Sequence, residues 1–382
     1  MRIIDMVNKE KVTGWRRHIH MYPEVAWSEH KTSAYIAEEI GKYDGIEVLR
    51  PTPTSVVAVL KGSKPGKTIG LRADIDALPI QEETNLEFAS RHAGVMHACG
   101  HDSHAAMLMG AVDVLHQRRD TLEGTVKFIF QHAEELQPGG AVEIVATGVL
   151  DDCEMFFAQH VFPKTPVGTA AVAIGPVSAN SDRFVIKIQG RGCHAASPHE
   201  GVDSLLVGAE IAQALNSITS RNVPSIERAV LSVCAFNAGD AFNVVPDTAE
   251  IKGTVRTLNP AIQKKIEARI RAITQGICAA YGATCEIEYD RGYDSMVNDA
   301  GAVNHFKRIA KATLPDLIIK EMTPMMGGED FSEYSKIGPI VFVEMGAGSD
   351  KFEYYAGHHP KYQIDEDVLP LGAALYAGFV TS

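Results

Sequence analysis

The sequence predicts an α/β fold in which a mainly parallel, helix-covered sheet is interrupted by a smaller inserted domain of the ferredoxin-like βαββαβ type. Apolar, β-branched runs alternate with helical patterns up to about residue 179, this alternation resumes after about residue 292, and the intervening pattern is different. A length of 382 residues also suggests two domains. We therefore predict a discontinuous metal-binding catalytic domain over 1–179 and 292–382, with an inserted lid and dimerisation domain over 180–291.

Alternating strands and helices define the larger domain. We expect strands at Ser55–Leu60, Thr68–Ala73, Thr125–Gln131 and Met155–Val161, helices at Ser103–Arg118 and Gly140–Val149, and, after the interruption, a helix at Asp299–Thr313, a strand at Ile340–Met345 and a closing helix from Glu366. Such an order is typical of βαβ units, whose strands are parallel.

The inserted segment has a different periodicity. Polar and apolar residues alternate over Asp182–Gln189, as in a half-exposed strand. We expect the following elements to be a helix at Val202–Ser220, strands at Arg228–Ala235 and Thr248–Thr257, a helix at Pro260–Tyr281 and a strand at Thr284–Asp290. The resulting β-α-β-β-α-β order is that of the split ferredoxin-like unit.

Composition and charge exclude several classes of function. A net charge of −12 argues against nucleic acid as a partner, because a phosphate backbone attracts basic proteins. The amino terminus lacks the apolar region of a secretory signal, and uncharged apolar runs stay short of membrane-spanning length, so we expect a cytoplasmic protein without a membrane partner. The six cysteines have no CxxC spacing, which fits reduced thiols.

One short segment carries the strongest chemical signal. His97–His104 contains one thiol, Cys99, and three imidazoles. Thiolate and neutral imidazole are the ligands that borderline-soft divalent metals prefer. A buried cysteine beside surface histidines would explain any one of these residues, but four together favour a metal site.

Carboxylate and imidazole side chains follow the ends of several predicted strands, where a doubly wound sheet binds its ligands. Taken singly, such aspartates could cap turns, such glutamates could open a helix, and such histidines could be core or surface residues. Together they favour one site. They are Asp74 and Asp76, Glu134 and Glu135, His160, and His358 and His359.

Two adjacent glutamates suit a metallohydrolase. One carboxylate can bind metal while its neighbour takes a proton from metal-activated water and delivers it to the leaving nitrogen. Glu134 and Glu135 could divide these tasks, because neighbours in a loop can point in different directions.

These motifs resemble the metallopeptidases and amidohydrolases that include aminoacylase and carboxypeptidase G, in particular the branch of hippurate hydrolases, N-acyl-L-amino acid amidohydrolases and indole-acetyl-amino-acid hydrolases. The resemblance covers essentially the whole chain. It rests on Arg72–Pro79, Met96–His104, Ala133–Glu135 with Gly139-Gly140, His160-Val161, Gly190–His199, Phe242–Asp247 with Gly253–Arg256, Gly328–Phe331 and Gly357–Pro360.

The resemblance implies two divalent metal ions per subunit, zinc or manganese in the first place, with cobalt or nickel as alternatives. Cys99 would bridge the two metal ions, Glu135 and His358 would complete the ligand set of one, and His101 and His160 would complete that of the other. Other branches of the family have histidine at the position of Asp74, and in this chain His101 would supply that ligand. If the loop register were shifted, His359 would replace His358.

The remaining roles implied by the resemblance concern catalysis and the substrate. Glu134 would be the general base and acid, Asp76 would orient the site, and His194 would stabilise the oxyanion, in some relatives across a dimer. The residues Asn243, Arg256 and Gly328 would contact the substrate, although Arg256 could equally be a surface charge. His132, Gln159 and His359 depart from the family pattern near the substrate pocket.

The sequence thus predicts a metal-dependent amidohydrolase that cleaves the amide bond of N-acyl amino acids of the hippurate or N-acetyl type, and that forms a homodimer or higher oligomer through the inserted domain. A dipeptidase or carboxypeptidase of the same family is one alternative, and a non-catalytic metal-dependent binding protein is another. A thiol redox role for Cys99 lacks a nearby resolving cysteine.

Overall fold

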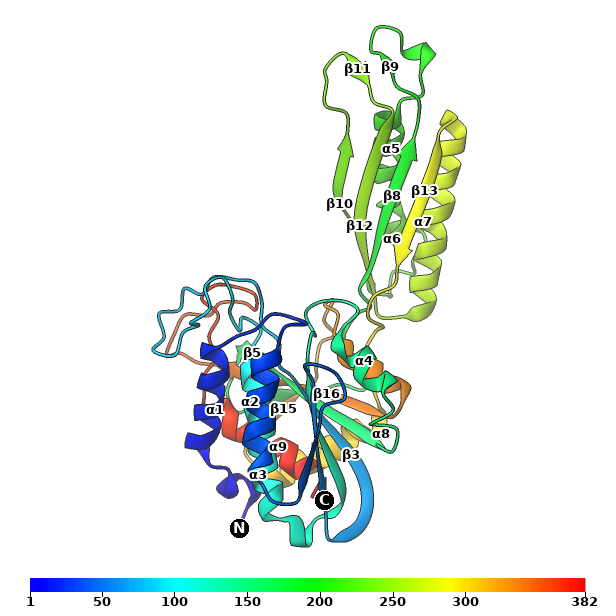
Figure 1. The fold of residues 1–382 in the computed structure, drawn as a ribbon. Helices are drawn as coiled ribbons and strands as arrows, with labels where there is room; N and C mark the ends of the chain where they lie inside the picture. The colour runs from blue at the N-terminus through cyan, green and yellow to red at the C-terminus, as the bar shows by residue number, and fades with distance from the viewer. Residues whose placement is uncertain (382) are drawn as a thin grey trace. The chain divides into compact units, whose positions relative to one another are not determined.

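The computed structural model describes residues 1–381, which form two compact units (Figure 1). The larger unit comprises Met1–Val177, Val297–Thr323 and the chain from Asp330 onward. The inserted unit comprises Ser178–Met296 and Pro324–Glu329. Among the described residues, no helix combines the length and apolar character needed to cross a membrane.

An eight-stranded sheet organises the larger unit, in the order β1-β2-β4-β3-β5-β16-β6-β15. Its four central strands are all parallel and confirm the predicted fold class. They are β4 (Glu123–Gln131), β3 (Lys64–Asp74), β5 (Met155–Pro166) and β16 (Ile340–Gly348). Because these strands share one direction, their carboxyl ends lie at the same edge of the sheet.

The flanks of the sheet are mixed. On one side β1 (Ile46–Leu49) and β2 (Val56–Lys61) are antiparallel to their neighbours. Only Gly62 and Ser63 separate β2 from β3, too few for the crossover that parallel strands require. On the other side β6 (Thr169–Ala171) is antiparallel to β16 and parallel to β15 (Ile318–Lys320). A separate pair joins β7 (Gly175–Pro176) to β14 (Val297–Asn298).

Helices cover both faces of the large sheet. On one face α3 (His101–Gln117) packs between α1 (Lys9–Met21) and α9 (Val368–Phe379), and α8 (Ala300–Thr313) packs on α9. Phe157 of β5 points into this layer, whereas its neighbour Phe156 contacts Tyr334 on the opposite face at 5.3 Å between ring centroids. The further helices are α2 (His30–Gly41), α4 (Gly140–Ala146), and the 3₁₀ turns η1 (Ile3–Met6), η2 (Arg119–Thr121) and η4 (Asp330–Lys336).

The inserted unit has the predicted ferredoxin-like order. Its four antiparallel strands pair as β10-β12-β8-β13. The elements are β8 (Asp182–Gln189), η3 (Pro198–Glu200), α5 (Ser204–Leu215), α6 (Ser217–Arg221), β10 (Ala229–Ala238), β12 (Thr248–Thr257), α7 (Pro260–Tyr281) and β13 (Thr284–Asp290), with a two-stranded ribbon of β9 (Cys193–His194) and β11 (Val244–Val245). The predicted helix Val202–Ser220 is divided at Asn216 into α5 and α6.

Close helix packing holds α3, and with it the first turn that carries His101. A Cβ atom added at Gly110 of α3 would lie 2.8 Å from both Ala373 of α9 and Val12 of α1. We therefore expect Gly110→Val to lower the free energy of unfolding by roughly 1–3 kcal/mol through overpacking. Urea denaturation measures this loss.

Gly14 of α1 is the matched control, because a Cβ there meets nothing within 4 Å. Gly14→Ala should leave stability unchanged or raise it by up to about 1 kcal/mol, since alanine is the better helix former. A Gly110→Val protein as stable as the Gly14→Ala protein would contradict the close packing.

Candidate metal centre and active site

Five of the predicted ligands converge at the carboxyl edge of the large sheet. Cys99 Sγ lies 3.4 Å from His160 Nε2, and Glu135 Oε1 lies 3.2 Å from His358 Nε2 and 3.9 Å from His101 Nε2. The donor atoms form two groups, each within 4.8 Å: Cys99 with His101 and His160, and Cys99 with Glu135 and His358. Because Cys99 belongs to both, the geometry agrees with a thiolate placed between two cations.

Gly100 lets the chain present Cys99 and His101 to the same site. Its φ of +92° is the left-handed conformation that glycine adopts without strain, and it ends the loop just before α3 begins. An added Cβ would lie 2.4 Å from Val161 on β5. The predicted helix therefore starts two residues earlier than expected, with His101 in its first turn.

Hydrogen bonds orient the two ligand imidazoles. His160 Nδ1 lies 2.9 Å from the carbonyl oxygen of Val161, so its protonated nitrogen points to the backbone and Nε2 faces Cys99. His101 Nδ1 lies 3.1 Å from Asp76 Oδ1, which leaves Nε2 facing Glu135. An acceptor on one ring nitrogen leaves the lone pair of the other nitrogen available to a cation.

The other two imidazoles of the motif do not serve as ligands in this arrangement. His104 Nδ1 lies 2.6 Å from Asp74, and its Nε2 accepts the Val161 N–H at 2.9 Å, so both ring nitrogens are occupied. His97 is 1% exposed and lies outside every ligand group found among residues 1–381. The segment His97–His104 thus contributes one imidazole, His101, and one thiol, Cys99, to the two groups of donor atoms.

Asp76 connects the two groups of donor atoms, because it contacts His101 of one group and Glu135 of the other. Its Oδ1 faces His101, and its Oδ2 accepts the backbone N–H of Glu135 at 2.9 Å. Asp74 instead pairs with Arg72 at 2.6 Å and with His104, in a fully buried network. Turn capping explains neither aspartate, and the contacts of Asp76 are those expected of a carboxylate that orients the site.

The electrostatics of the cluster favour a bound cation. Burial and the neighbouring Glu135 carboxylate raise the pKa of the Cys99 thiol to about 12, so the thiol alone stays protonated, which disfavours a redox role. His101 Nε2 is buried without a hydrogen-bond partner among the described residues, and Glu135 Oε1 is a buried oxygen that faces the imidazoles of His358 and His101. A divalent cation would satisfy both atoms and stabilise the thiolate, so this donor set fits a metal.

Glu134 is buried beside this donor set. It is 7% exposed, and one of its oxygens lies within 4.8 Å of donor atoms of His101 and Glu135. Ala133, with φ of +51°, turns the chain sharply between β4 and the two glutamates. The alternative of a solvated acidic pair at the start of a helix is therefore wrong for Glu134.

The loop before the last helix presents His358 rather than His359 to the cluster. The His358 N–H donates to the Ala98 carbonyl at 2.8 Å, and its left-handed φ of +67° directs the ring to Glu135. His359 Nδ1 accepts the Lys361 N–H, and its ring stacks on Tyr355 at 4.5 Å between centroids.

The residues predicted to contact the substrate from the inserted unit lie in two groups. His194 and Asn243 share the β9–β11 ribbon, where the Ala195 N–H donates to the Asn243 carbonyl. Arg256 donates to the Asp182 carbonyl at 3.1 Å, and Gly328 packs against Ser181, which precedes Asp182 in the chain. The start of β12 lies beside the ribbon, because Asp247 accepts the Gly192 N–H. Arg256 is eight residues further along this strand, a distance of about 26 Å, so a single inserted unit does not bring Arg256 and Gly328 close to His194 and Asn243.

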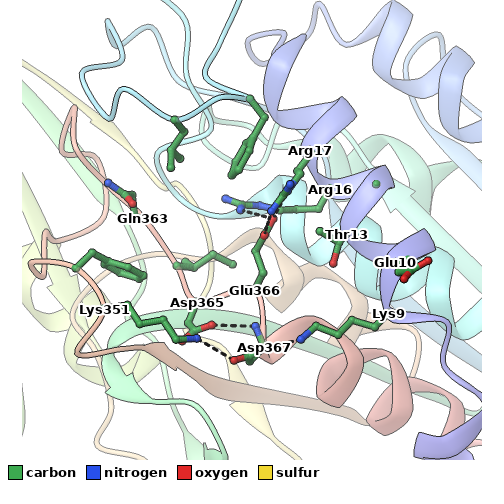
Figure 2. A pocket seen from close by; sticks show the side chains of 15 residues that line it. Lys9, Glu10, Thr13, Arg16, Arg17, Lys351, Gln363, Asp365, Glu366 and Asp367 are labelled. Carbon is green, nitrogen blue, oxygen red and sulfur yellow. Dashed lines mark hydrogen bonds and ion pairs between the residues drawn. The ribbon is translucent and has the colours of Figure 1, made fainter.

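A cavity of about 830 Å³ in the larger unit lies apart from the predicted ligands (Figure 2). Most of its charged side chains pair with one another: Glu366 binds Arg16 and Arg17, and Asp367 binds Lys9 and Lys351. These pairs neutralise the walls of the cavity, and it contains none of the residues predicted for catalysis.

Two buried carboxylates, Asp330 and Glu29, lie near Glu134 and its neighbours and were not among the predicted site residues. Glu29 is fully buried at the start of α2, and it accepts the Ala133 N–H at 2.8 Å. An acidic residue at the beginning of a helix is ordinary, so the sequence offers no signal for this contact.

Comparisons with known proteins identify the family. Residues 70–382 match peptidase family M20/M25/M40. The chain is 44% identical to an N-acyl-L-amino acid amidohydrolase of Geobacillus stearothermophilus over 80% of this chain and 82% of that protein. It is 38% identical to thermostable carboxypeptidase 1 of Saccharolobus solfataricus over 98% of each.

The chain belongs to peptidase family M20/M25/M40. A solved structure of a dinuclear metal-binding M20 peptidase from Bacillus subtilis superposes with a TM-score of 0.86 at 35% identity, covering 98% of this chain and 97% of that one. The predicted resemblance and enzyme class are confirmed: the protein is a hydrolase of the M20 family, whose structures combine a catalytic domain with an inserted lid domain.

The two neighbouring loop histidines provide a direct test of the ligand set. His358→Ala should weaken binding of one metal ion at least about tenfold, because it removes a donor from the Cys99–Glu135 group. His359→Ala should bind both metals as the wild type does. Titration of the metal-free protein with Zn²⁺ or Mn²⁺ measures both, and equal losses in the two variants would refute the assignment.

Proposed function

We propose that this M20 enzyme hydrolyses the amide bond of N-acyl amino acids and releases a carboxylic acid and a free amino acid. The observation that carries the proposal is the position of Glu134, buried beside two groups of metal-binding donor atoms that share Cys99. The 44% identical relative named as an N-acyl-L-amino acid amidohydrolase supports the substrate class.

Each residue near the donor groups has a separate task in this proposal. Cys99, Glu135 and His358 would hold one divalent cation, and Cys99, His101 and His160 the other. When bound, the two cations supply Lewis-acid polarisation of the scissile carbonyl and a lowered pKa for the attacking water. Zinc and manganese are the expected metals, with cobalt and nickel as alternatives, since the donors are of mixed softness.

Glu134 would move the proton. Its carboxylate accepts the proton of the attacking water and then transfers it to the leaving nitrogen, so that the C–N bond breaks as an amine departs. Asp76 supports this step indirectly: it holds the His101 ring and accepts the Glu135 N–H, and donor atoms of both residues lie within 4.8 Å of a Glu134 oxygen.

The inserted unit would supply the remaining contacts with the substrate. His194 would stabilise the developing oxyanion, Asn243 and Arg256 would hold the substrate carboxylate, and Gly328 would also contact the substrate. The separation of these residues along the inserted unit favours a site completed by two subunits, and we retain the prediction of a homodimer formed through this unit.

A peptidase of the same family is the second candidate. The 38% identical carboxypeptidase of Saccharolobus solfataricus supports it, since a carboxypeptidase cleaves the same type of bond next to a free carboxylate. A non-catalytic binding protein is less well supported, because it needs neither the buried Glu134 nor the Asp76 contacts.

Replacing the proposed base is the direct test of the mechanism. Glu134→Gln removes proton transfer while retaining the shape of the side chain, so kcat should fall at least about 100-fold with both metals still bound. Steady-state hydrolysis and elemental analysis measure the two quantities. Glu38→Gln, on the exposed surface of α2, is the control and should leave both unchanged; near-normal turnover in Glu134→Gln would refute the mechanism.

A matched pair of substrates separates the two candidate functions. After reconstitution with Zn²⁺, Mn²⁺, Co²⁺ or Ni²⁺, we expect kcat/KM for N-acetyl- or N-benzoyl-leucine to exceed that for alanyl-leucine at least about tenfold, because a charged amino terminus must lose water in an acyl pocket. The reverse preference would establish the peptidase, and no turnover of either compound would favour the binding protein.

A further inference from the structure

The backbone between β4 and the two glutamates adopts an unusual conformation. Ala133 has a left-handed φ of +51°, although it is not glycine, and it is fully buried. Left-handed backbone costs an L-residue roughly 1–2 kcal/mol, so surrounding contacts must hold it in place. The geometry of Glu134 and Glu135 depends on this turn, because both follow it directly.

Three hydrogen bonds restrain this turn. The Ala133 carbonyl accepts the Gly140 N–H at 3.2 Å, and Asp76 accepts the Glu135 N–H at 2.9 Å. The third comes from a distant part of the chain: Glu29 Oε1 accepts the Ala133 N–H at 2.8 Å. Glu29 and Asp76 therefore hold the backbone on either side of Glu134.

Glu29 is itself held rigidly. The same oxygen, Oε1, accepts the N–H of Trp27 at 3.1 Å, and Trp27 also has a left-handed φ, of +68°. The Trp27 ring contacts His132, the residue before Ala133, at 5.1 Å between ring centroids. Two turns of unfavourable conformation thus meet at one carboxylate oxygen of a fully buried residue.

We propose that Glu29 is a positioning residue for the active site: by accepting the Ala133 N–H, it fixes the turn that aims Glu134 at the substrate and Glu135 at the metal. The part of this inference that concerns Glu134 rests on the proposed function, whereas the part that concerns Glu135 requires only a metal site. Glu29 touches neither metal nor substrate in this role.

The role requires a hydrogen-bond acceptor and not a negative charge. Burial and the nearby Asp76 carboxylate raise the pKa of Glu29 to about 7. Oε1 can accept both N–H groups whether or not the other oxygen carries a proton. Glutamine retains such an oxygen, whereas methionine fills a similar volume without a comparable acceptor.

Three variants test the proposal: Glu29→Met, Glu29→Gln and, as the control, Glu24→Ala. Glu24 accepts the N–H groups of Lys31 and Thr32 in the first turn of α2, so its loss weakens the same helix without touching Ala133. The full-length protein is stripped of metal, titrated with Zn²⁺ or Mn²⁺ by calorimetry, reloaded, and assayed on N-acyl amino acids. Thermal unfolding of the metal-free proteins is recorded in parallel.

We expect Glu29→Met to weaken metal binding and to lower kcat at saturating metal, each at least about tenfold, because a displaced turn misplaces both glutamates. Glu29→Gln should stay within about threefold of the wild type in both measurements. Glu24→Ala should also stay within about threefold while unfolding at a lower temperature.

Several results would overturn the proposal. Metal affinity and kcat of Glu29→Met within threefold of the wild type would do so, as would equal losses in Glu24→Ala. If Glu29→Met does not fold, Glu29→Gln decides alone: a tenfold loss of metal affinity would show that the charge matters, and retention would support the acceptor role. A wild type that turns over no N-acyl amino acid contradicts the proposed function, but the metal titrations still decide the role of Glu29.

Discussion

Parallel pairing of β3 with β4 and β5 is the constraint on which the site depends. Asp74 at the end of β3 is in register with Gln131 at the end of β4, and Arg72 is in register with Ala158 of β5. The loops that follow these strands therefore leave the same edge of the sheet. As a result, Asp76, the two glutamates and His160 come together although up to 84 positions separate them in the chain.

Carboxylates perform different tasks around this edge, and because Asp74, Asp76 and Glu29 are all buried, their partners distinguish these tasks. Asp74 is neutralised by Arg72 within the core and stabilises the sheet. Asp76 instead faces the His101 imidazole and accepts the Glu135 N–H, and Glu29 accepts backbone N–H groups, so both shape the site. A buried carboxylate is costly, so its retention beside these donor atoms is more readily explained by function than by stability.

The sequence predicted the regular elements well where a hydrophobic period extends over many residues. Strand β8 and helix α7 have the predicted bounds, because long alternating or helical patterns are local signals. The short strands β1, β6 and β15, of three or four residues, were not predicted, since their pairing is set by neighbours in the sheet. The antiparallel direction of β2 likewise follows from a connection of two residues.

The sequence by itself determined the kinds of chemical group available and the family, because a thiol, imidazoles and paired glutamates in this order are a property of the chain. Only the tertiary structure decided which of them act together. His101 faces the other donor atoms, whereas both ring nitrogens of His104, one helical turn away, are hydrogen-bonded to Asp74 and Val161. Likewise, the contact of Glu29 with Ala133 joins residues 104 positions apart. Such choices depend on hydrogen bonds between distant segments, which no local pattern records.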